Sequence, residues 1–402
     1  MYDAIIVGAR CAGSPLAMLL ARQGQKVLLV DRAEFPSDTV STHGMKKPAV
    51  AHLSEWGLID QVLASNCPPI HSLRLDVGPL VLQGSAPPIP GGEFDIAPRR
   101  YVLDTLLAKA AVAAGAEFRE CFTVEDLLFD DGTVCGIRGH ARGGASVEER
   151  ARIVVGADGR NSRVAQAAGV PLTVDRGAFC CAYYSYFSGV PSSSIELYTR
   201  PGRQIIAFPT NDDLTMVMVE WPRAEFPQVR SDIEGTFMAS LDLAPEFAER
   251  VRAGRREERF SGSAELPNYQ RQAFGPGWAL VGDALSHKDP ILAQGITDAF
   301  HDAAFLAAAL GEAYSGVKPL DAALADFAAR HMECSMPLFE ATCQFATLQP
   351  PPPEMQQLLG ALLGNQPATD QFFGTIVGTV PMHEFYAPEN LERIMQAAAR
   401  VA

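Results

Sequence analysis

The chain has 402 residues, of which 48% are hydrophobic and 20% charged, and its formal net charge is −14. This length predicts two domains of ordinary globular composition, and the acidic balance argues against nucleic acid or an anionic membrane surface as a partner. Neither a basic leader before an apolar stretch nor an apolar run of about 18 residues is present. We therefore expect no signal peptide, no stable membrane insertion and a cytoplasmic location.

The eight cysteines form no C-x-x-C pair and match no zinc-site spacing. This usage is typical of a reduced protein with incidental thiols, and it predicts neither disulfides nor a bound metal.

The first 32 residues predict a strand, a glycine-rich turn, a helix and a second strand. The stretch "DAIIVGARCAG" places Gly8 and Gly13 in the first and third glycine positions of G-x-G-x-x-G, with Arg10 in the middle position. A helix over 14–24 and a buried strand over 26–32 follow, and the strand ends in Asp31. Such a turn and helix start suit a pyrophosphate, and the carboxylate suits a ribose diol. The alternative is a β-α-β unit that binds nothing.

Two later stretches have a similar form. Residues 151–164 predict a strand that ends before Asp158 and Gly159, and residues 275–310 predict a strand that ends in Gly282 and Asp283 and leads into a long helix. Both place an acidic residue at the carboxyl end of a strand, where ligands bind in open α/β sheets. Taken alone, either stretch could be a structural turn.

The order of these motifs resembles the FAD-dependent aromatic hydroxylase superfamily, which also contains geranylgeranyl reductases and flavin-dependent halogenases, and within it the G-A-R-C-A-G type of FAD-dependent oxidoreductase. The resemblance covers about residues 1–310. It implies an α/β fold (α+β overall): a Rossmann-like FAD-binding domain of the p-hydroxybenzoate hydroxylase type, an inserted antiparallel or mixed β-sheet substrate domain and a helical C-terminus. It also implies that FAD is bound by Gly8, Arg10, Cys11, Ala12, Gly13, Asp31, Arg32, Arg100, Val124, Asp158, Gly159, Gly282, Asp283, Pro290, Gln294, Gly295 and Ile296.

The sequence departs from the family pattern at three positions. Arg10 replaces the central glycine, His287 follows the G-D pair one place later than usual, and Thr297 stands where the family has asparagine. The displaced histidine puts in doubt any role for a histidine after that pair. For Arg10 we expect a side chain that turns outward or adds charge near the pyrophosphate.

Only one dinucleotide fingerprint is present, so we expect no separate nicotinamide domain. Aromatic-rich, alternating segments between the motifs predict the substrate sheet. We assign residues 1–70, 97–177 and 275–330 to the FAD-binding domain, 71–96 and 178–274 to the substrate sheet, and 331–402 to a helical segment interrupted by the stiff stretch 349–354.

The resemblance implies an FAD-dependent monooxygenase that hydroxylates a bulky, aromatic or polyketide-like small molecule with molecular oxygen, through a flavin C4a-hydroperoxide. NADH or NADPH is the expected transient reductant, with a separate flavin reductase as the alternative. Halogenases carry W-x-W-x-I-P, whereas "QIIAFP" has Gln204 and Ile206 in the tryptophan positions, which disfavours halogenation. A reductase or dehydrogenase of the geranylgeranyl-reductase type is the main alternative, and a flavin-binding module without turnover is a further one. No oligomeric state is predicted.

Candidate substrate contacts come from a loop and from the sheet. Ser41 and His43 follow the second strand, where the superfamily's loop passes close to the flavin. The alternative for His43 is a helix cap or a bond to the backbone. The net charge disfavours a strongly anionic substrate unless Arg203 or Arg223 offsets it.

Sheet residues Tyr184, Tyr186, Trp221 and Phe208 are further candidates, and period-two alternation puts Tyr184 and Tyr186 on one face and Tyr183 on the other. Sheet core is the alternative for these aromatic residues. We expect Lys46 and Lys47 at the solvated surface.

Overall fold

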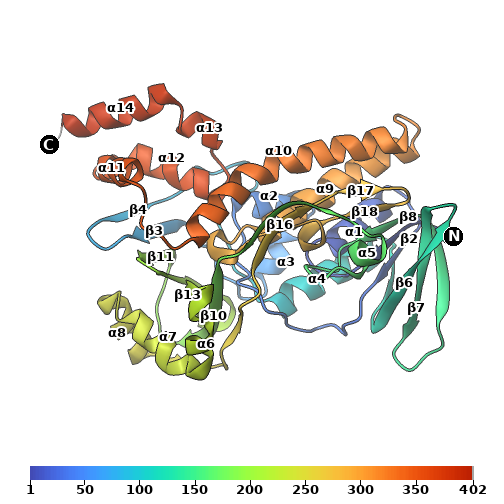
Figure 1. Cartoon of the computed structure of the whole chain (residues 1–402), viewed down its shortest axis with the longest axis horizontal. Helices are drawn as coiled ribbons and strands as arrows, with labels where there is room; N and C mark the ends of the chain where they lie inside the picture. The colour runs from blue at the N-terminus through green and yellow to red at the C-terminus, as the bar shows by residue number, and fades with distance from the viewer. Residues whose placement is uncertain (401–402) are drawn as a thin grey trace.

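The computed structural model describes residues 1–400 and arranges them as three sheets surrounded by helices (Figure 1). Residues 401 and 402 of the expected helical segment 331–402 lie outside the described part of the chain. The mixed α/β architecture confirms the predicted fold class. All eight cysteines are free thiols.

The first sheet has the strand order β17-β18-β8-β1-β2-β5, with β7 pairing β8 and β6 pairing β7. Its strands are β1 (Tyr2–Val7), β2 (Val27–Val30), β5 (Glu117–Arg119), β6 (Phe122–Asp130), β7 (Thr133–Ala141), β8 (Val147–Gly156), β17 (Phe274–Gly275) and β18 (Trp278–Leu280). Strands β1, β8 and β18 run parallel, and Gly156 pairs with both Val7 and Leu280. The three predicted motifs therefore leave this sheet at one edge.

Helices α1 (Gly13–Arg22), α4 (Arg100–Ala113) and α9 (Gly295–Tyr314) pack on the first sheet, and α1 contacts both of the others. Shorter helices complete this part of the chain: α2 (Lys47–Glu55), α3 (Ile59–Leu63) and α5 (Arg163–Ala167). Apolar side chains of these helices and of the strands form one continuous core, which holds the parallel strands in place.

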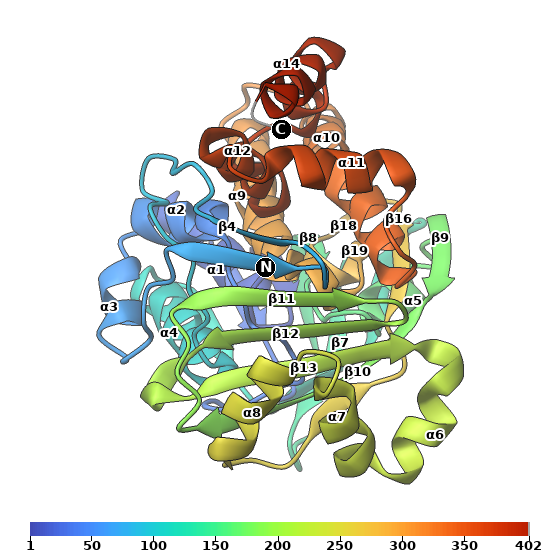
Figure 2. The same cartoon turned by 90° about the vertical axis from the view of Figure 1, so that its left-hand side faces the viewer.

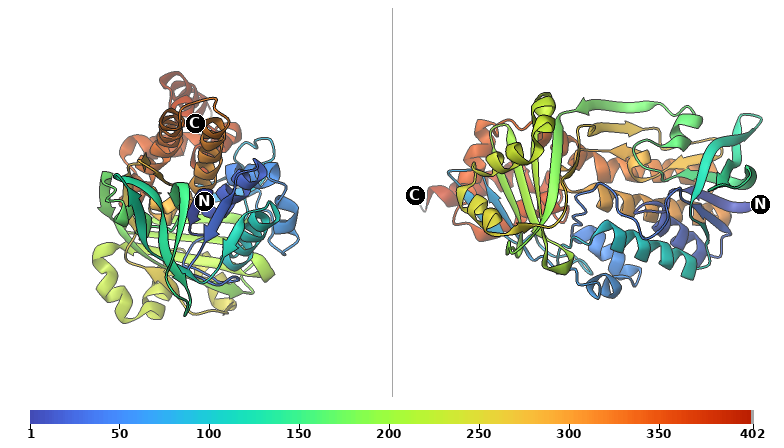
Figure 3. Two further views of the ribbon diagram at one scale, coloured as in Figure 1. Left: turned by 90° about the vertical axis from the view of Figure 1, so that its right-hand side faces the viewer. Right: turned by 90° about the horizontal axis from the view of Figure 1, so that it is seen from below.

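The second sheet has the order β14-β10-β13-β12-β11-β3-β4, with β15 pairing β10. Its strands are β3 (Ser72–Asp76), β4 (Val81–Gly84), β10 (Cys180–Ser188), β11 (Ser194–Arg200), β12 (Arg203–Pro209), β13 (Thr215–Pro222), β14 (Arg255–Arg256) and β15 (Ser261–Ser263). Strands β3 and β4 lie within segment 71–96 and join the sheet through β11. Figure 3 shows this sheet at the end of the molecule opposite the β6–β7 hairpin.

Both faces of the second sheet are covered. Tyr184 and Tyr186 belong to one apolar cluster, whereas Tyr183 packs on the opposite cluster, as the alternation predicted. The second cluster contains residues of α6 (Phe226–Ser231), α7 (Ile233–Leu241) and α8 (Pro245–Ala253), which Figure 2 shows in front of β10–β13. These three helices were not expected, since residues 178–274 were assigned to the substrate sheet.

A third, smaller sheet has the order β19-β16-β9, formed by β9 (Leu172–Ala178), β16 (Pro267–Arg271) and β19 (Ser286–His287). Four 3₁₀ turns occur: η1 (Asn211–Asp213), η2 (Arg223–Glu225), η3 (Gly282–Ala284) and η4 (Pro290–Leu292). Two of them, η3 and η4, lie between β18 and α9, in the third motif.

The remaining helices are α10 (Leu320–Ala346), α11 (Pro353–Leu362), α12 (Gln366–Val377), α13 (Met382–Phe385) and α14 (Pro388–Ala399). Helix α10 runs through the boundary expected between residues 330 and 331, and it packs against α9. The last two residues of the proline stretch 349–354 already belong to α11, which begins at Pro353. Among residues 1–400, no helix combines the length and apolar character that crossing a membrane requires.

Candidate functional site

The three glycine motifs touch one another at the carboxyl edge of the first sheet. A Cβ atom on Gly8 (φ +104°) would lie 2.3 Å from the carbonyl oxygen of Ala157, and one on Gly13 would lie 1.8 Å from the carbonyl oxygen of Gly8. A Cβ atom on Gly282 would lie 2.9 Å from the Cβ atom of Ala12. Only glycine fits at such contacts, so this edge is built for close backbone approach.

Asp31 is tied to the edge by its backbone neighbours. Its Oδ2 accepts the N–H of Ala9 at 2.7 Å, and its Oδ1 accepts the N–H of Ala33 at 2.8 Å. Each carboxylate oxygen keeps a lone pair for a ribose hydroxyl. Arg32 is exposed, and Val124 lies in β6, whose first residue Phe122 donates its N–H to the carbonyl of Asp31 at 2.8 Å.

Arg10 is bound by side chains of α4 and of the loop after β2. Its guanidinium contacts Oδ2 of Asp104 at 2.5 Å and Oγ of Ser37 at 3.0 Å. Asp104 is fully buried in α4 and also binds Nε of Arg100 at 3.1 Å and Sγ of Cys11 at 3.3 Å. Asp104 therefore joins the turn to α4, and Arg10 extends the link to the loop after β2. Asp104 was missed, although its position four residues after Arg100 on a helix is the signal for such a pair.

Two side chains of the later motifs leave polar atoms without partners. Oδ2 of Asp158 caps α5 by accepting the N–H of Arg163 at 2.6 Å, whereas its Oδ1 is buried and has no partner within residues 1–400. Burial raises the pKa of Asp158. Nε2 of Gln294 donates to the carbonyl of Ile376 at 2.7 Å, and its Oε1 has no partner in the described chain.

The other motif residues lie around the same edge. Asp283 is exposed in η3, and a Cβ atom on Gly295 would lie 3.9 Å from its Oδ1. Gly159 has a φ of +78°, Pro290 begins η4, and Ile296 is buried in the first turn of α9. The site offers hydrogen-bond donors in the glycine turns and in the free N–H groups at the start of α1. It offers acceptors in the buried oxygens that have no partner. FAD requires such donors and acceptors along its diphosphate, its ribityl chain and its ring edges. The residues present therefore fit this cofactor.

A buried chain of hydrogen bonds holds the Gly282 turn. Oδ2 of Asp302 accepts the N–H of Gly282 at 2.9 Å, and its Oδ1 lies 2.6 Å from Nδ1 of His331. Burial disfavours the charged imidazole, but the pairing with Asp302 outweighs it and raises the pKa of His331. Nε2 of His331 donates to Gln270 at 3.1 Å. The histidine that follows the G-D pair, His287, instead bonds to the carbonyl of Pro267.

The loop after β2 is bonded to the tyrosines of β10. Nδ1 of His43 donates to the carbonyl of Ala97 at 3.1 Å, which leaves Nε2 as the acceptor for the hydroxyl of Tyr186 at 2.9 Å. Burial, with a smaller effect of Arg99, lowers the pKa of His43 to about 3, so the ring is neutral. The N–H of Ser41 donates to the hydroxyl of Tyr184 at 3.2 Å.

Other sheet residues divide between the two faces. The ring of Phe208 lies 5.7 Å from that of His43, and a Cβ atom on Gly44 would lie 3.2 Å from the Cβ atom of Ala293 in the third motif. The structure thus brings the loop after β2, the aromatic face and the third motif together. Trp221 does not join them, because it packs on the opposite face with Nε1 donating to Ser240 at 3.0 Å.

Arg99 was not among the candidates from the sequence. Its guanidinium carbon lies 3.7 Å from the ring centroid of Tyr186, and the group forms ion pairs with Asp38 and Glu258. Arg203 pairs with Glu225, and Arg223 pairs with Glu265. Because both guanidinium groups are already paired with carboxylates, neither is free to attract an anionic substrate.

The expected surface position of Lys46 and Lys47 is wrong, since they are 4% and 1% exposed. Segment 86–97 covers the start of α2: the N–H of Lys47 donates to Oδ1 of Asp95 at 2.8 Å, and its Nζ donates to the carbonyl of Ala86 at 2.5 Å. Lys46 lines a cavity of about 20 Å³ with apolar walls from β11, β12 and the third motif, among them Ile195, Ile206, Phe208 and Leu292. Burial lowers the pKa of Lys46, against the attraction of Asp95.

A larger cavity, of about 1310 Å³, lies elsewhere, between α8 and the β3, β11 and β13 region of the second sheet. Its arginines are already paired, Arg74 and Arg200 with Asp76 and Arg250 with Glu196. It includes none of the motif residues, so size alone does not locate the candidate site.

Parallel strands with a glycine edge, and a second sheet joined to that edge by two loops, define a flavin-binding oxidoreductase architecture. The family model described as the FAD binding domain matches residues 1–330, and the chain belongs to this family.

Similar proteins fall into several activity classes. Digeranylgeranylglycerophospholipid reductase of Methanocella arvoryzae is 29% identical over 310 residues, which are 74% of this chain and 74% of that protein. The flavin-dependent brominase Bmp2 superposes with a TM-score of 0.82 at 17% identity over 100% of both chains. PqsL, a probable FAD-dependent monooxygenase from Pseudomonas aeruginosa, superposes with a TM-score of 0.72 at 22% identity over 94% of this chain and 100% of that chain. At such identities the two structures establish the fold alone.

Proposed function

We propose that this chain is an FAD-dependent monooxygenase that hydroxylates a bulky, mostly apolar molecule of aromatic or polyketide-like type, with NADH or NADPH as transient reductant. The observation that supports this proposal is the joining of the glycine edge to the aromatic face of Tyr184, Tyr186 and Phe208 through the loops 41–46 and 290–295. FAD, when bound, supplies the redox chemistry and the activation of oxygen. The chain's residues bind the substrate, orient it and exclude water.

Tyr186 and His43 form the polar contact in the proposed substrate site. Because His43 is neutral and accepts the hydroxyl proton of Tyr186, the phenol oxygen of Tyr186 keeps its lone pairs for a substrate hydroxyl. A bulky substrate needs more room than the cavity of about 20 Å³ at Lys46, so the isoleucine, leucine and phenylalanine side chains around it have to move apart before they form an apolar wall for the rest of the molecule.

A reductase is the second candidate, favoured by the 29% identity with the digeranylgeranylglycerophospholipid reductase of Methanocella arvoryzae. The same apolar wall also suits a prenyl chain. Halogenation is disfavoured because Gln204 and Ile206 occupy the tryptophan positions of the halogenase motif.

The test uses the purified, FAD-reconstituted protein, which should show flavin absorption near about 370 and 450 nm. NADH and NADPH oxidation is followed against a panel of phenols and polycyclic aromatics, with an added flavin reductase in a parallel series. A monooxygenase gives a product heavier by one oxygen atom in air and none without oxygen. A product that gains two hydrogens and still forms without oxygen would replace the proposal by the reductase.

A further inference from the structure

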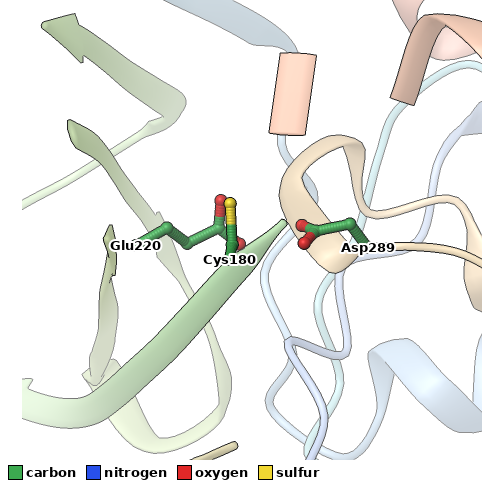
Figure 4. A group of neighbouring side chains, drawn as sticks. All are labelled: Cys180, Glu220 and Asp289. Carbon is green, nitrogen blue, oxygen red and sulfur yellow. The ribbon is translucent and has the colours of Figure 1, made fainter. Parts of the chain in front are cut away.

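Outside the glycine edge, three buried side chains from separate segments point toward one another. Figure 4 shows Cys180 and Glu220 on neighbouring strands, β10 and β13, with Asp289 reaching them from the loop before η4. Cys180 Sγ and one carboxylate oxygen of each acid lie within 4.8 Å of one another. The three residues are 0%, 0% and 1% exposed, so solvent does not satisfy them.

The carboxylates of this cluster lack partners. Neither oxygen of Glu220 has a hydrogen-bond partner within residues 1–400, nor has Oδ2 of Asp289. Oδ1 of Asp289 accepts the N–H of Ile291 at 3.1 Å, which fixes the carboxylate with Oδ2 free. A buried polar group without a partner costs several kcal/mol. Three orphaned oxygens beside a thiol therefore require either a cation or bound protons.

No basic side chain of the described residues neutralises the two acids of the cluster. None of the ion pairs of residues 1–400 includes Glu220 or Asp289, and Lys288, next to Asp289 in the sequence, pairs with Asp298 at 2.6 Å instead. Sγ of Cys180 lies 2.9 Å from the carbonyl oxygen of Ala346, the last residue of α10. The carbonyls that end a helix have no intrahelical partner and form the negative end of its dipole. The 27-residue helix α10 thus adds negative potential to a cluster that already holds two acids.

We propose that Cys180, Glu220 and Asp289 bind one divalent cation of the zinc class, with the carbonyl of Ala346 as a fourth donor. One thiolate with carboxylate oxygens suits this borderline-soft ion, whereas Mg²⁺ and Ca²⁺ require six or more oxygens. Zinc–sulfur and zinc–oxygen bonds of about 2.3 and 2.1 Å place tetrahedral ligands about 3.4–3.6 Å apart. The three side-chain ligand atoms lie within 4.8 Å of one another, so small side-chain rotations bring them to that spacing. Binding releases to solvent the thiol proton and any proton held between the two acids.

A cation at this site would also hold the loop that leads into the third motif at the glycine edge. Asp289 directly precedes η4, and η4 leads to Gln294 and Gly295 in the third motif. A cation held by Asp289 and by two strands of the second sheet would fix this loop against the sheet. Sequence spacing conceals such a site, because the ligands lie 40 and 69 positions apart and no two share a motif.

The experiment uses the untagged, FAD-loaded full chain, dialysed against EDTA and then titrated with zinc. Bound metal is counted by elemental analysis after gel filtration, and the unfolding temperature is followed with and without zinc. A cobalt-loaded sample reports thiolate coordination through a sulfur-to-cobalt absorption band. A difference spectrum against the cobalt-free, FAD-loaded protein separates this band from the flavin absorption. Variants Glu220→Gln and Cys180→Ser test the site, and Cys135→Ser on β7 is the matched control thiol.

We expect one zinc per chain, a higher unfolding temperature with zinc, and a cobalt–sulfur band that Cys180→Ser abolishes. Glu220→Gln should weaken zinc binding by about a hundredfold or more, since even outer-shell partners contribute 10–100-fold, and Cys135→Ser should bind zinc as the wild type does. A wild-type chain that retains no zinc and gains no thermal stability from it would overturn the proposal. If Glu220→Gln is then more stable than the wild type, the two acids share a proton instead.

Discussion

Asp104 is the carboxylate that ties the first glycine turn to α4, and Asp104→Asn should lower the free energy of unfolding markedly. Removing one partner of a buried ion pair costs about 3–5 kcal/mol, because the other charge stays buried. The side chain of Asp104 is 0% exposed and that of Arg100 is 11% exposed, whereas Arg10 is 24% exposed and can rehydrate. We therefore expect the lower end, a loss of about 3 kcal/mol.

Urea unfolding of the FAD-loaded protein measures this loss as a shift of the midpoint at unchanged slope. The matched control is Asp126→Asn, which removes the charge from a surface pair with Arg138 whose side chains are 50% and 47% exposed. That change should cost about 1 kcal/mol or less. Equal losses in the two variants would refute the role assigned to Asp104.

Three further changes test other parts of the site. Gly13→Val should abolish FAD binding because its Cβ would lie 1.8 Å from a backbone oxygen, whereas Arg10→Gly should change FAD affinity by less than about tenfold in fluorescence titration. The folded pKa of His43, about 3, lies below its unfolded value, so its contribution to stability is complete above about pH 6.5 and is lost as the pH falls toward 3. His43→Gln should remove that part of the pH slope, up to about 1.4 kcal/mol per pH unit in urea unfolding. Lys46→Met should raise the unfolding temperature, because it removes a buried amine from apolar surroundings. The same variant should raise KM without releasing FAD. An unchanged KM would exclude contact between Lys46 and the substrate.

Local patterns predicted the parts of the site that depend on backbone geometry. A side chain at Gly8 or Gly282 would collide with another motif, and one at Gly13 would collide with Gly8 of its own turn. A glycine in a strand–turn–helix pattern signals such contacts from the sequence alone. Tyr184 and Tyr186 share a face because strand side chains alternate.

Residues that act through distant partners could not be found in this way. Lys46 follows a polar loop and resembles a surface residue, yet segment 86–97 covers it. Asp302 and His331 sit on α9 and α10, where a buried charge interrupts the apolar face and has no visible role until its partner from another segment is known. Tertiary contacts, which no local pattern encodes, decide these positions.

Oxygen insertion is the central claim, and a single turnover in labelled dioxygen tests it most directly. The FAD-loaded protein is reduced without oxygen, mixed with a substrate that stimulates NADH or NADPH oxidation, and exposed to ¹⁸O₂ in unlabelled water. Mass spectrometry of the product should show one ¹⁸O atom for each flavin reoxidised. A product with oxygen from water, or one that has gained two hydrogens and no oxygen, would contradict the account.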